Sequence, residues 1–332
     1  MALISVSNLK KRFNLEAGFF ARFGRFVRAV NGIDFFIDRN ECYGLVGESG
    51  CGKTTTARLL VRMYEADEGN ILFEGADQGS AVDVRTLKRG ELKKYREKVK
   101  YVFQDPARSL NPRMTVFEVL SSGAKWSARK SEEKTEASLY NEAAAILEEV
   151  GLSPADLERR PAEFSGGQRQ RISIARGLMM EPELLICDEV VSALDVSIQG
   201  QILNLLLDIR ERREISFLFI AHDLKVACYF CDRIGVMYRG EIMEEAPAAE
   251  LWKNGLHPYT ELLFSSVRNS SISGNFALKQ AAPPFSVSAL KSTGPDSCAF
   301  VSRCPYGEDR CFREKPELRS AADGHMVRCW KR

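Results

Sequence analysis

The chain opens with short stretches in which apolar and polar residues alternate, a pattern typical of β-strands. Three of them are rich in β-branched and aromatic residues and are separated by turn residues: 3–9, 29–37 and 42–47. Later, short apolar runs alternate with longer helical patterns, in the order 184–187, 197–213, 216–221, 222–230 and 233–238. Alternation of strand and helix predicts βαβ units and a mostly parallel sheet.

The middle and the end of the chain differ from this pattern. Between about 105 and 165 apolar residues recur at helical spacing, and Gly151 is placed to end one such stretch, so we expect a helical subdomain there. After 265 the chain becomes rich in Ser, Pro and Gly, typical of a linker, and then contains four cysteines. The sequence therefore predicts two parts, 1–265 and 266–332.

Composition and charge exclude only a few classes of protein. With 332 residues, 45% apolar and 28% charged, the chain is ordinary and globular, and a net charge of +2 gives no reason to expect nucleic acid. Its apolar runs are shorter than the ~18–20 residues of a membrane-spanning helix, and the N-terminus lacks a signal-peptide core. We expect a soluble, cytosolic protein in which cysteines bind metal or are buried rather than form disulfides.

A phosphate-binding loop is the clearest motif. Residues 47–54 read GESGCGKT and fit G-x-x-x-x-G-K-[ST] between an apolar strand and a helical stretch. Backbone N–H groups of such a loop face a β-phosphate, while Lys53 would reach the β and γ oxygens and Thr54 would ligate Mg²⁺. The residues predicted to bind nucleotide here are Gly47, Glu48, Ser49, Gly50, Cys51, Gly52, Lys53, Thr54 and Thr55.

Polar side chains follow the apolar strands at the edge where open α/β sheets bind ligands. Asp188 and Glu189 follow 184–187; Asp188 would hold Mg²⁺ through water and Glu189 would polarise the attacking water. His222 follows 216–221 and would contact the γ-phosphate or fix Glu189. Gln104 follows another strand and would reach both metal and water, a capping role being the alternative.

A second candidate anion site begins at Ser165. Ser165, Gly166 and Gly167 precede a helical pattern, so their backbone N–H groups would face an anion. Because the chain already has one phosphate loop, this segment binds a different anion or serves the nucleotide of another chain.

Together these motifs resemble the ATP-binding-cassette (ABC) ATPases. Six occur in that family's order between Leu3 and Tyr259: 47–54, 104, 165–168, 184–189, 192–195 and 221–223. The resemblance implies an α/β P-loop NTPase cassette, with a RecA-like mixed sheet, an antiparallel β subdomain and a helical subdomain, followed by a small cysteine-containing domain. It also implies a head-to-tail pair, in which ATP held by one subunit is closed over by four residues of the other: Ser165, Gly166, Gly167 and Gln168.

The resemblance further implies an aromatic ring that stacks on adenine. Phe13 is the preferred match, and Phe26 is the alternative because residues 14–28, which contain Phe26, are inserted after Phe13. The basic residues of that insert are expected to form a solvated loop, with phosphate headgroups or a partner as alternatives: Arg22, Arg25 and Arg28. Val190 stands where the family usually has proline, which puts loop rigidity in doubt rather than activity.

Two further stretches, 104–116 and 257–267, resemble the ATPase subunits of dipeptide and oligopeptide importers. This implies a peripheral ATPase on the cytoplasmic face of the membrane. Its partners would be a second, non-identical ATPase and two membrane permeases, supplied by a substrate-binding protein. Importers of nickel, opines or glutathione belong to the same group. A soluble cassette protein acting on ribosomes or DNA is the alternative from another class.

The cysteine tail has little apolar material for a core of its own, which a metal centre would replace. Its four cysteines lack the C-x2-C spacing of common zinc sites, and the family also implies a [4Fe–4S] cluster, so this is preferred to zinc or free thiols. The predicted ligands are Cys298, Cys304, Cys311 and Cys329, with His325 as a substitute. A chain regulated by the redox state of that cluster is a third functional hypothesis.

The remaining cysteines have simpler interpretations. Cys228 and Cys231 are expected to be buried thiols of a helix, Cys42 and Cys187 to lie in the strand core, and Cys51 to be open to oxidation.

Overall fold

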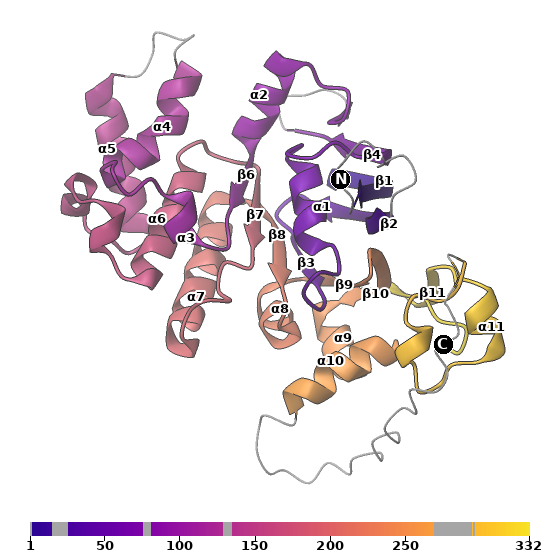
Figure 1. Ribbon diagram of the computed structural model, residues 1–332. Coiled ribbons are helices and arrows are strands. Elements are labelled where there is room, and N and C mark those ends of the chain that lie inside the picture. The colour runs from indigo at the N-terminus through magenta and orange to yellow at the C-terminus, as the bar shows by residue number, and fades with distance from the viewer. Residues whose placement is uncertain (1, 15–25, 76–80, 129–134, 269–293, 295) are drawn as a thin grey trace.

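The computed structural model describes residues 2–14, 26–75, 81–128, 135–268, 294 and 296–332. The described residues form a four-stranded sheet in the order β2-β1-β4-β5 and an eight-stranded sheet in the order β11-β12-β10-β9-β3-β8-β7-β6. Figure 1 shows the first sheet beside α1 and the helices gathered around the second.

The four-stranded sheet is antiparallel and consists of β1 (Ala2–Asn14), β2 (Phe26–Asp38), β4 (Glu68–Phe73) and β5 (Val82–Asp83). Along β1 the buried side chains include Leu3, Val6 and Leu9, and they belong to the same apolar cluster as the buried face of α1 (Lys53–Leu60). The predicted strands at 3–9 and 29–37 are confirmed, and both continue beyond those limits.

The centre of the larger sheet is parallel, as predicted. Its strands are β6 (Val99–Val102), β7 (Leu184–Asp188), β8 (Ser216–Ala221), β3 (Cys42–Val46) and β9 (Arg233–Tyr238). Nearly all of their residues are buried, because helices pack on one face and the four-stranded sheet with α1 packs on the other, which explains why the sequence shows continuous apolar runs there. β10 (Glu241–Pro247) is antiparallel to β9.

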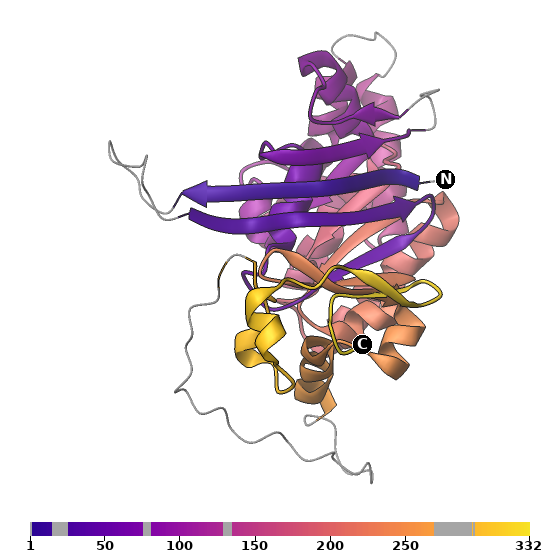
Figure 2. The same cartoon turned by 90° about the vertical axis from the view of Figure 1, so that its right-hand side faces the viewer.

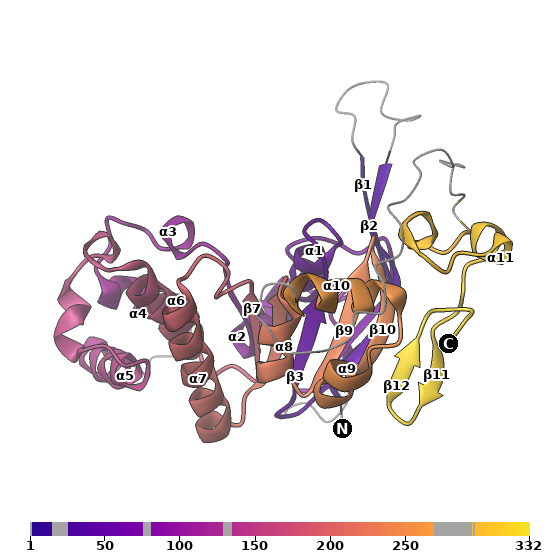
Figure 3. The same cartoon turned by 90° about the horizontal axis from the view of Figure 1, so that it is seen from below.

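The helices that precede the tail fall into two groups. Those connected to the sheets are α1, α2 (Arg89–Lys98), α7 (Val196–Arg213), α8 (Leu224–Phe230), α9 (Ala248–Asn254) and α10 (Pro258–Arg268). Between β6 and β7 the chain forms α3 (Pro106–Ser109), α4 (Val116–Ala128), α5 (Glu136–Glu149), two 3-10 turns (Pro154–Glu158 and Pro161–Glu163) and α6 (Gly166–Leu178). Figures 1 and 3 place α3 to α6 together at one end of the molecule. The predicted helical insertion is therefore present.

The C-terminal tail packs against the larger sheet. It contains a 3-10 turn (Val301–Arg303), α11 (Asp309–Arg313), β11 (Arg319–Ala322) and β12 (His325–Val327). β12 pairs with β10, so the tail extends the larger sheet, as Figure 2 shows in yellow beside orange. Phe300, Cys298 and Cys311 are buried in the same apolar cluster as the central strands. The tail thus shares the main core, and most of the predicted linker lies outside the described residues.

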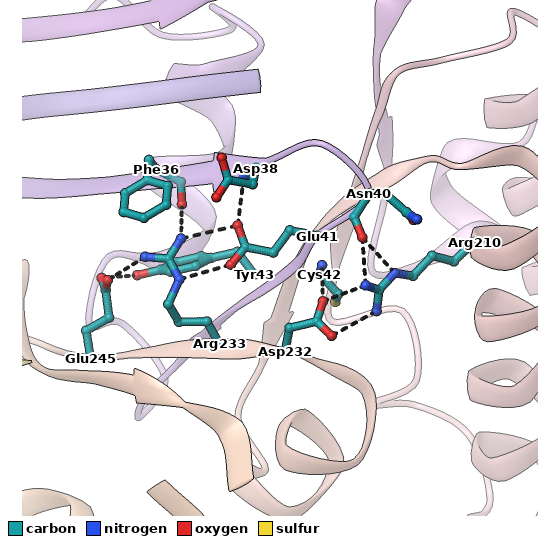
Figure 4. Close-up of polar contacts among 10 residues, drawn as sticks. All are labelled: Phe36, Asp38, Asn40, Glu41, Cys42, Tyr43, Arg210, Asp232, Arg233 and Glu245. Atoms are coloured by element: carbon teal, nitrogen blue, oxygen red, sulfur yellow. Dashed lines mark hydrogen bonds and ion pairs between the residues drawn. The ribbon is translucent and has the colours of Figure 1, made fainter. Parts of the chain in front are cut away.

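Two arginines lie at the starts of the parallel strands, and one of them, Arg233, links the two sheets (Figure 4). Arg233 pairs with Glu41 (2.9 Å) and Glu245 (2.7 Å) and donates to the Phe36 carbonyl of β2 (2.9 Å). Arg210 of α7 pairs with Asp232 at 2.7 Å. Because this network precedes the strands, it lies at the end of the sheet opposite the phosphate loop.

Helices of the described part are all too short or too polar to cross a bilayer.

Candidate active site

The phosphate loop joins β3 to α1 and requires glycine at two positions where the chain is crowded. A Cβ atom on Gly47 would lie 2.1 Å from the Met237 carbonyl oxygen, and one on Gly52 would lie 2.1 Å from that of Ala29. Gly52 also has a φ of +114°, which side chains disfavour. The close approach of β2 and β9 therefore shapes the loop.

Lys53 extends back over the loop. Its Nζ donates to the carbonyl oxygens of Gly47 (2.7 Å) and Glu48 (3.1 Å), and the residue is only 3% exposed. The same Nζ lies 4.0 Å from Oε1 of Glu189, so the positive charge sits between the loop and the predicted catalytic carboxylate.

Thr54 and Asp188, both predicted to hold Mg²⁺, are in direct contact. Thr54 Oγ1 donates to Asp188 Oδ1 at 2.9 Å, and Asp188 is almost fully buried at the end of β7. The other oxygen of this carboxylate accepts from the Tyr101 hydroxyl at 2.5 Å. Burial and the neighbouring carboxylate raise the pKa of Tyr101, which keeps it a donor. Tyr101 was missed from the sequence, although it lies three residues before Gln104.

Glu189 is held in an uncommon backbone conformation. Its φ is +49°, and its N–H donates to the Ile220 carbonyl of β8 at 3.0 Å. Such a conformation in a non-glycine residue costs on the order of 1–3 kcal/mol and is concentrated at functional sites. Gln104 Nε2 donates to Glu189 Oε2 at 2.8 Å. His222 lines the same pocket as Glu189, together with Ser192 and Gln199.

The side chains around Asp188 suit a magnesium ion. Mg²⁺ prefers oxygen ligands, which here are the Thr54 hydroxyl and the Asp188 carboxylate, while the amide nitrogen of Gln104 contacts the neighbouring Glu189. The structure therefore brings together the predicted catalytic and magnesium residues from the ends of β6, β7 and β8.

The second anion site lies at the start of α6. Ser165 caps this helix: its Oγ accepts from the Gln168 N–H (3.3 Å), and its own N–H donates to the Gln168 side chain (2.9 Å). Ser165 and Gly166 are exposed. Figures 1 and 3 place α6 and α1 on opposite sides of β7, so this helix start and the phosphate loop occupy different regions of the subunit.

The two candidate adenine-binding rings differ in exposure. Phe13 packs edge-on against Tyr64 at 5.3 Å and is half-buried. Phe26 is 47% exposed, and the guanidinium groups of Arg12 and Arg28 each lie 5.8 Å from its ring centre. Phe26 is therefore the more exposed of the two rings. Of the basic residues in the insert, Arg22 and Arg25 lie outside the described residues.

The four tail cysteines line one pocket, together with His257, Phe300 and Trp330: Cys298, Cys304, Cys311 and Cys329. Burial raises the pKa of Cys298 to about 11, so this thiol is protonated at neutral pH. Within the described ranges, no group of three or more His, Cys, Asp and Glu side chains is arranged to hold a metal ion.

His325 is not part of that pocket, which corrects its assignment as a substitute ligand. Its Nε2 lies 2.7 Å from Oε1 of Glu244, a fully buried carboxylate that also accepts from the N–H groups of Leu256 and His257. A buried carboxylate needs such donors. His325 thereby anchors the tail to β10.

The other cysteines are mostly buried, as predicted. Cys42 and Cys187 lie in the strand core, and the sulfur of Cys42 is 3.5 Å from that of Cys231. Cys228 is only half-buried. The expectation that Cys51 is open to oxidation is wrong, because it is 5% exposed and burial raises its pKa, which disfavours the reactive thiolate.

Two residues far from the motifs also contact the phosphate loop. Arg303 of the tail forms a two-pronged ion pair with Glu48, at 2.8 and 2.9 Å, and this pairing lowers the pKa of Glu48. The Glu48 N–H donates to the hydroxyl of Tyr259 in α10 at 2.8 Å. Both were missed as site residues; Tyr259 belongs to the importer-like stretch 257–267, whereas no local pattern indicated Arg303.

Two family models match the chain. The model described as "ABC transporter" matches residues 30–192, and the one described as "Oligopeptide/dipeptide transporter, C-terminal region" matches residues 243–311.

Relatives with similar sequences match over nearly the whole length. The oligopeptide transport ATP-binding protein AppF of Bacillus subtilis is 41% identical over 98% of this chain and 96% of its own. The probable peptide ABC transporter ATP-binding protein y4tS of Sinorhizobium fredii is 40% identical over 99% of this chain and 89% of its own.

Solved structures show the same fold. CbiO1 of Clostridium perfringens, part of the ABC transporter complex cbiONQ, superposes with a TM-score of 0.64 at 26% identity, over 76% of this chain and 92% of its own. The ATP-binding cassette MJ0796, in a dimeric post-hydrolysis state with ADP and Pi, gives 0.63 at 25% identity, over 74% and 98%. The predicted fold class is confirmed.

Proposed function

Because the chain belongs to the ABC transporter family and is an ATPase of that family, we propose that it powers the import of dipeptides or oligopeptides through a membrane transporter. Support comes from the names of its relatives and from the match of residues 243–311 to a peptide-transporter C-terminal region. In this proposal residues 1–265 are the ATPase part, and 266–332 are the linker and tail.

The observation that carries the ATPase chemistry is the convergence of Lys53, Thr54, Asp188, Glu189 and Gln104 at one edge of the sheet. Lys53 and the loop N–H groups bind the β- and γ-phosphates. Bound Mg²⁺, held by Thr54, Asp188 and Gln104, would neutralise phosphate charge. Glu189 orients a water and accepts its proton as the new P–O bond forms and the bond to ADP breaks. Gln104 holds Glu189 in place for that task.

A second ATPase subunit completes the site in this proposal. Ser165 and Gly166 are exposed at the start of α6, and together with the half-buried Gly167 and Gln168 they close on the ATP of a neighbouring subunit. ATP then acts as a clamp between subunits, and hydrolysis releases it. The neighbour is a non-identical ATPase, and the pair sits on two permeases at the cytoplasmic face of the membrane, supplied by a substrate-binding protein.

Hydrolysis is tested with the purified chain and its Glu189→Gln variant. We expect Mg-dependent ATP hydrolysis that falls at least about 100-fold in Glu189→Gln, while MgATP still binds. The matched control is Glu211→Gln, which removes an equal charge from an exposed position of α7 and leaves hydrolysis unchanged. Equal rates in the two variants would refute the assigned role of Glu189.

Cargo and partners require a separate experiment. Tagged chain should co-purify with two permeases and a second ATPase in mild detergent, and cells lacking the chain should lose uptake of labelled dipeptides or oligopeptides. If the cells lose uptake of nickel, an opine or glutathione instead, that compound is the cargo. If the tagged chain co-purifies with ribosomes or DNA and with no permease, the soluble alternative is favoured.

For the tail we propose a [4Fe–4S] cluster held by the four cysteines that line one pocket: Cys298, Cys304, Cys311 and Cys329. Cysteine thiolates are the usual ligands of such a cluster, and a single zinc ion held by the same thiolates is the alternative. When bound, the cluster would crosslink the segment that contains Cys298, Cys304 and Cys311 to Cys329 near the end of the tail.

Elemental analysis of anaerobically purified protein tests this proposal. We expect iron and sulfide in equal amounts, lost in Cys304→Ser and retained in the control Cys228→Ser, which alters a half-buried cysteine outside the pocket. Stoichiometric zinc would support the alternative, and protein free of both metals would refute a metal centre.

A further inference from the structure

Glu48, inside the phosphate loop, is held at three points, and two of them come from outside the nucleotide-binding motifs. Its carbonyl accepts from Lys53, its N–H donates to Tyr259, and its carboxylate pairs with both terminal nitrogens of Arg303. The loop conformation therefore depends on residues more than 200 positions away in the sequence.

Arg303 is oriented by an aromatic cluster, which we define as Tyr238, Tyr259 and Phe300. Phe300 of the tail packs at 5.3 Å on both Tyr238 and Tyr259, and the guanidinium of Arg303 lies 5.7 Å from the rings of Tyr238 and Phe300. All three rings are nearly fully buried. The cluster fixes the 3-10 turn that ends at Arg303, so the arginine reaches Glu48 from a rigid support.

We propose that Arg303 is a positioning residue for the phosphate loop, through which the tail raises the affinity of the ATPase for MgATP. An arginine fork on a carboxylate restricts orientation as well as distance. Fixing Glu48 in this way reduces the freedom that the loop N–H groups would lose when they close on phosphate. The tail is then part of the nucleotide site, although Arg303 itself does not act on the phosphates.

The contact also works in the opposite direction, because coupling between two sites is reciprocal. A phosphate loop ordered by MgATP should hold Arg303 more firmly, and with it the turn that leads into Cys304. We therefore expect nucleotide to slow amide hydrogen exchange in residues 300–304, and to slow it less in Glu48→Gln.

The primary test compares Arg303→Ala with Arg313→Ala in the full chain. Arg313→Ala is the matched control, because it removes the same charge from the same tail. The side chain of Arg313 is 78% exposed. In Arg303→Ala we expect faster amide exchange over residues 47–54 without nucleotide, and a Kd for MgATP raised about two- to fivefold, the size expected when a half-exposed ion pair is lost. Arg313→Ala should match the wild type in both measurements.

Two further variants separate positioning from general damage. Arg303→Lys keeps the charge but loses the fork, and should give an intermediate Kd. If the two residues act as a pair, the double variant with both Arg303→Ala and Glu48→Gln should have the same Kd for MgATP as Glu48→Gln alone. Should Arg303→Ala lower the melting temperature by more than a few degrees, Arg303→Lys carries the test instead.

The inference rests on the proposed binding of ATP to this loop, but the exchange measurement without nucleotide does not. Faster loop exchange in Arg303→Ala, with no MgATP binding by the wild type, would contradict the proposed function and leave the positioning role standing. Loop exchange and Kd equal to those of Arg313→Ala would overturn the positioning role alone.

Discussion

Replacing Arg233 by Met should cost the protein a large part of its stability. Arg233 is the centre of the network in Figure 4, where it pairs with Glu41 and Glu245, donates to the Phe36 carbonyl and lies 3.7 Å from the centre of the Phe36 ring. Met has a similar length and fills the same space, so the change mainly removes charge and hydrogen bonds. It leaves two carboxylates facing each other.

The magnitude follows from how deeply these groups are buried. The side chains of Arg233, Glu41 and Glu245 are 14%, 13% and 11% exposed. Removing one partner of a buried pair costs about 3–5 kcal/mol. Glu245 keeps the hydrogen bond from Tyr43 at 2.7 Å, which offsets part of the loss. We therefore expect about 3 kcal/mol, against about 0–0.5 kcal/mol for the exposed control Arg313→Met.

The pH dependence provides a second, independent check. Burial raises the pKa of Glu245, and Arg233 partly counteracts it, so the variant should raise that pKa further. A carboxyl group whose pKa is higher in the folded state destabilises that state once the pH exceeds its unfolded pKa. The full cost is present above the folded pKa. The difference from the wild type should therefore be largest at neutral pH and shrink as the pH falls through the raised pKa of Glu245.

Urea unfolding at neutral and acidic pH measures both quantities, with the m-value as the check that unfolding exposes the same surface. A loss below about 1 kcal/mol at neutral pH would refute the reasoning about burial. A loss that grows on acidification would refute the assignment of the effect to Glu245.

Three other changes test the site and the tail. Gly52→Ala should abolish MgATP binding, because its Cβ would lie 2.1 Å from a carbonyl oxygen of β2; a normal Kd by titration would contradict this. Phe26→Ala should raise the Kd for MgATP more than Phe13→Ala, because the Phe26 ring is more exposed. A larger effect of Phe13→Ala would favour Phe13 as the ring that stacks on adenine. His325→Ala leaves the buried Glu244 without one donor and should cost about 1–3 kcal/mol, measured by urea unfolding, where no change would contradict the anchoring role.

The parts of the site that the sequence predicted are those encoded by neighbouring residues. The loop around Lys53, the acids at the end of β7 and the cap at Ser165 each lie within a few positions, and parallel strands bring their carboxyl ends to one edge. The contact of Tyr101 with Asp188 depends on the register of β6 against β7, which no local pattern fixes.

The tail was harder to predict because its contacts are long-range. β11 and β12 are four and three residues long and show no strand pattern, so pairing with β10 could not be inferred. His325 was interpreted as a metal ligand because it lies near cysteines in sequence, whereas its partner is a carboxylate 81 positions away. Phe300 similarly gave no sign that it would complete a cluster with Tyr238 and Tyr259.

The position of Arg303 also limits what a redox signal from the tail could do. Arg303 directly precedes Cys304, which lines the cysteine pocket. A structural change at that pocket can therefore displace Arg303 and so reach Glu48. The change in ATP affinity that such a structural change causes through the Arg303–Glu48 contact cannot exceed the change caused by removing Arg303, which is about fivefold. Moving a two-state equilibrium from almost fully one state to the other needs about 10⁴-fold. Chemistry at the cysteines would therefore modulate the ATPase through Arg303 and could not switch it off by that route.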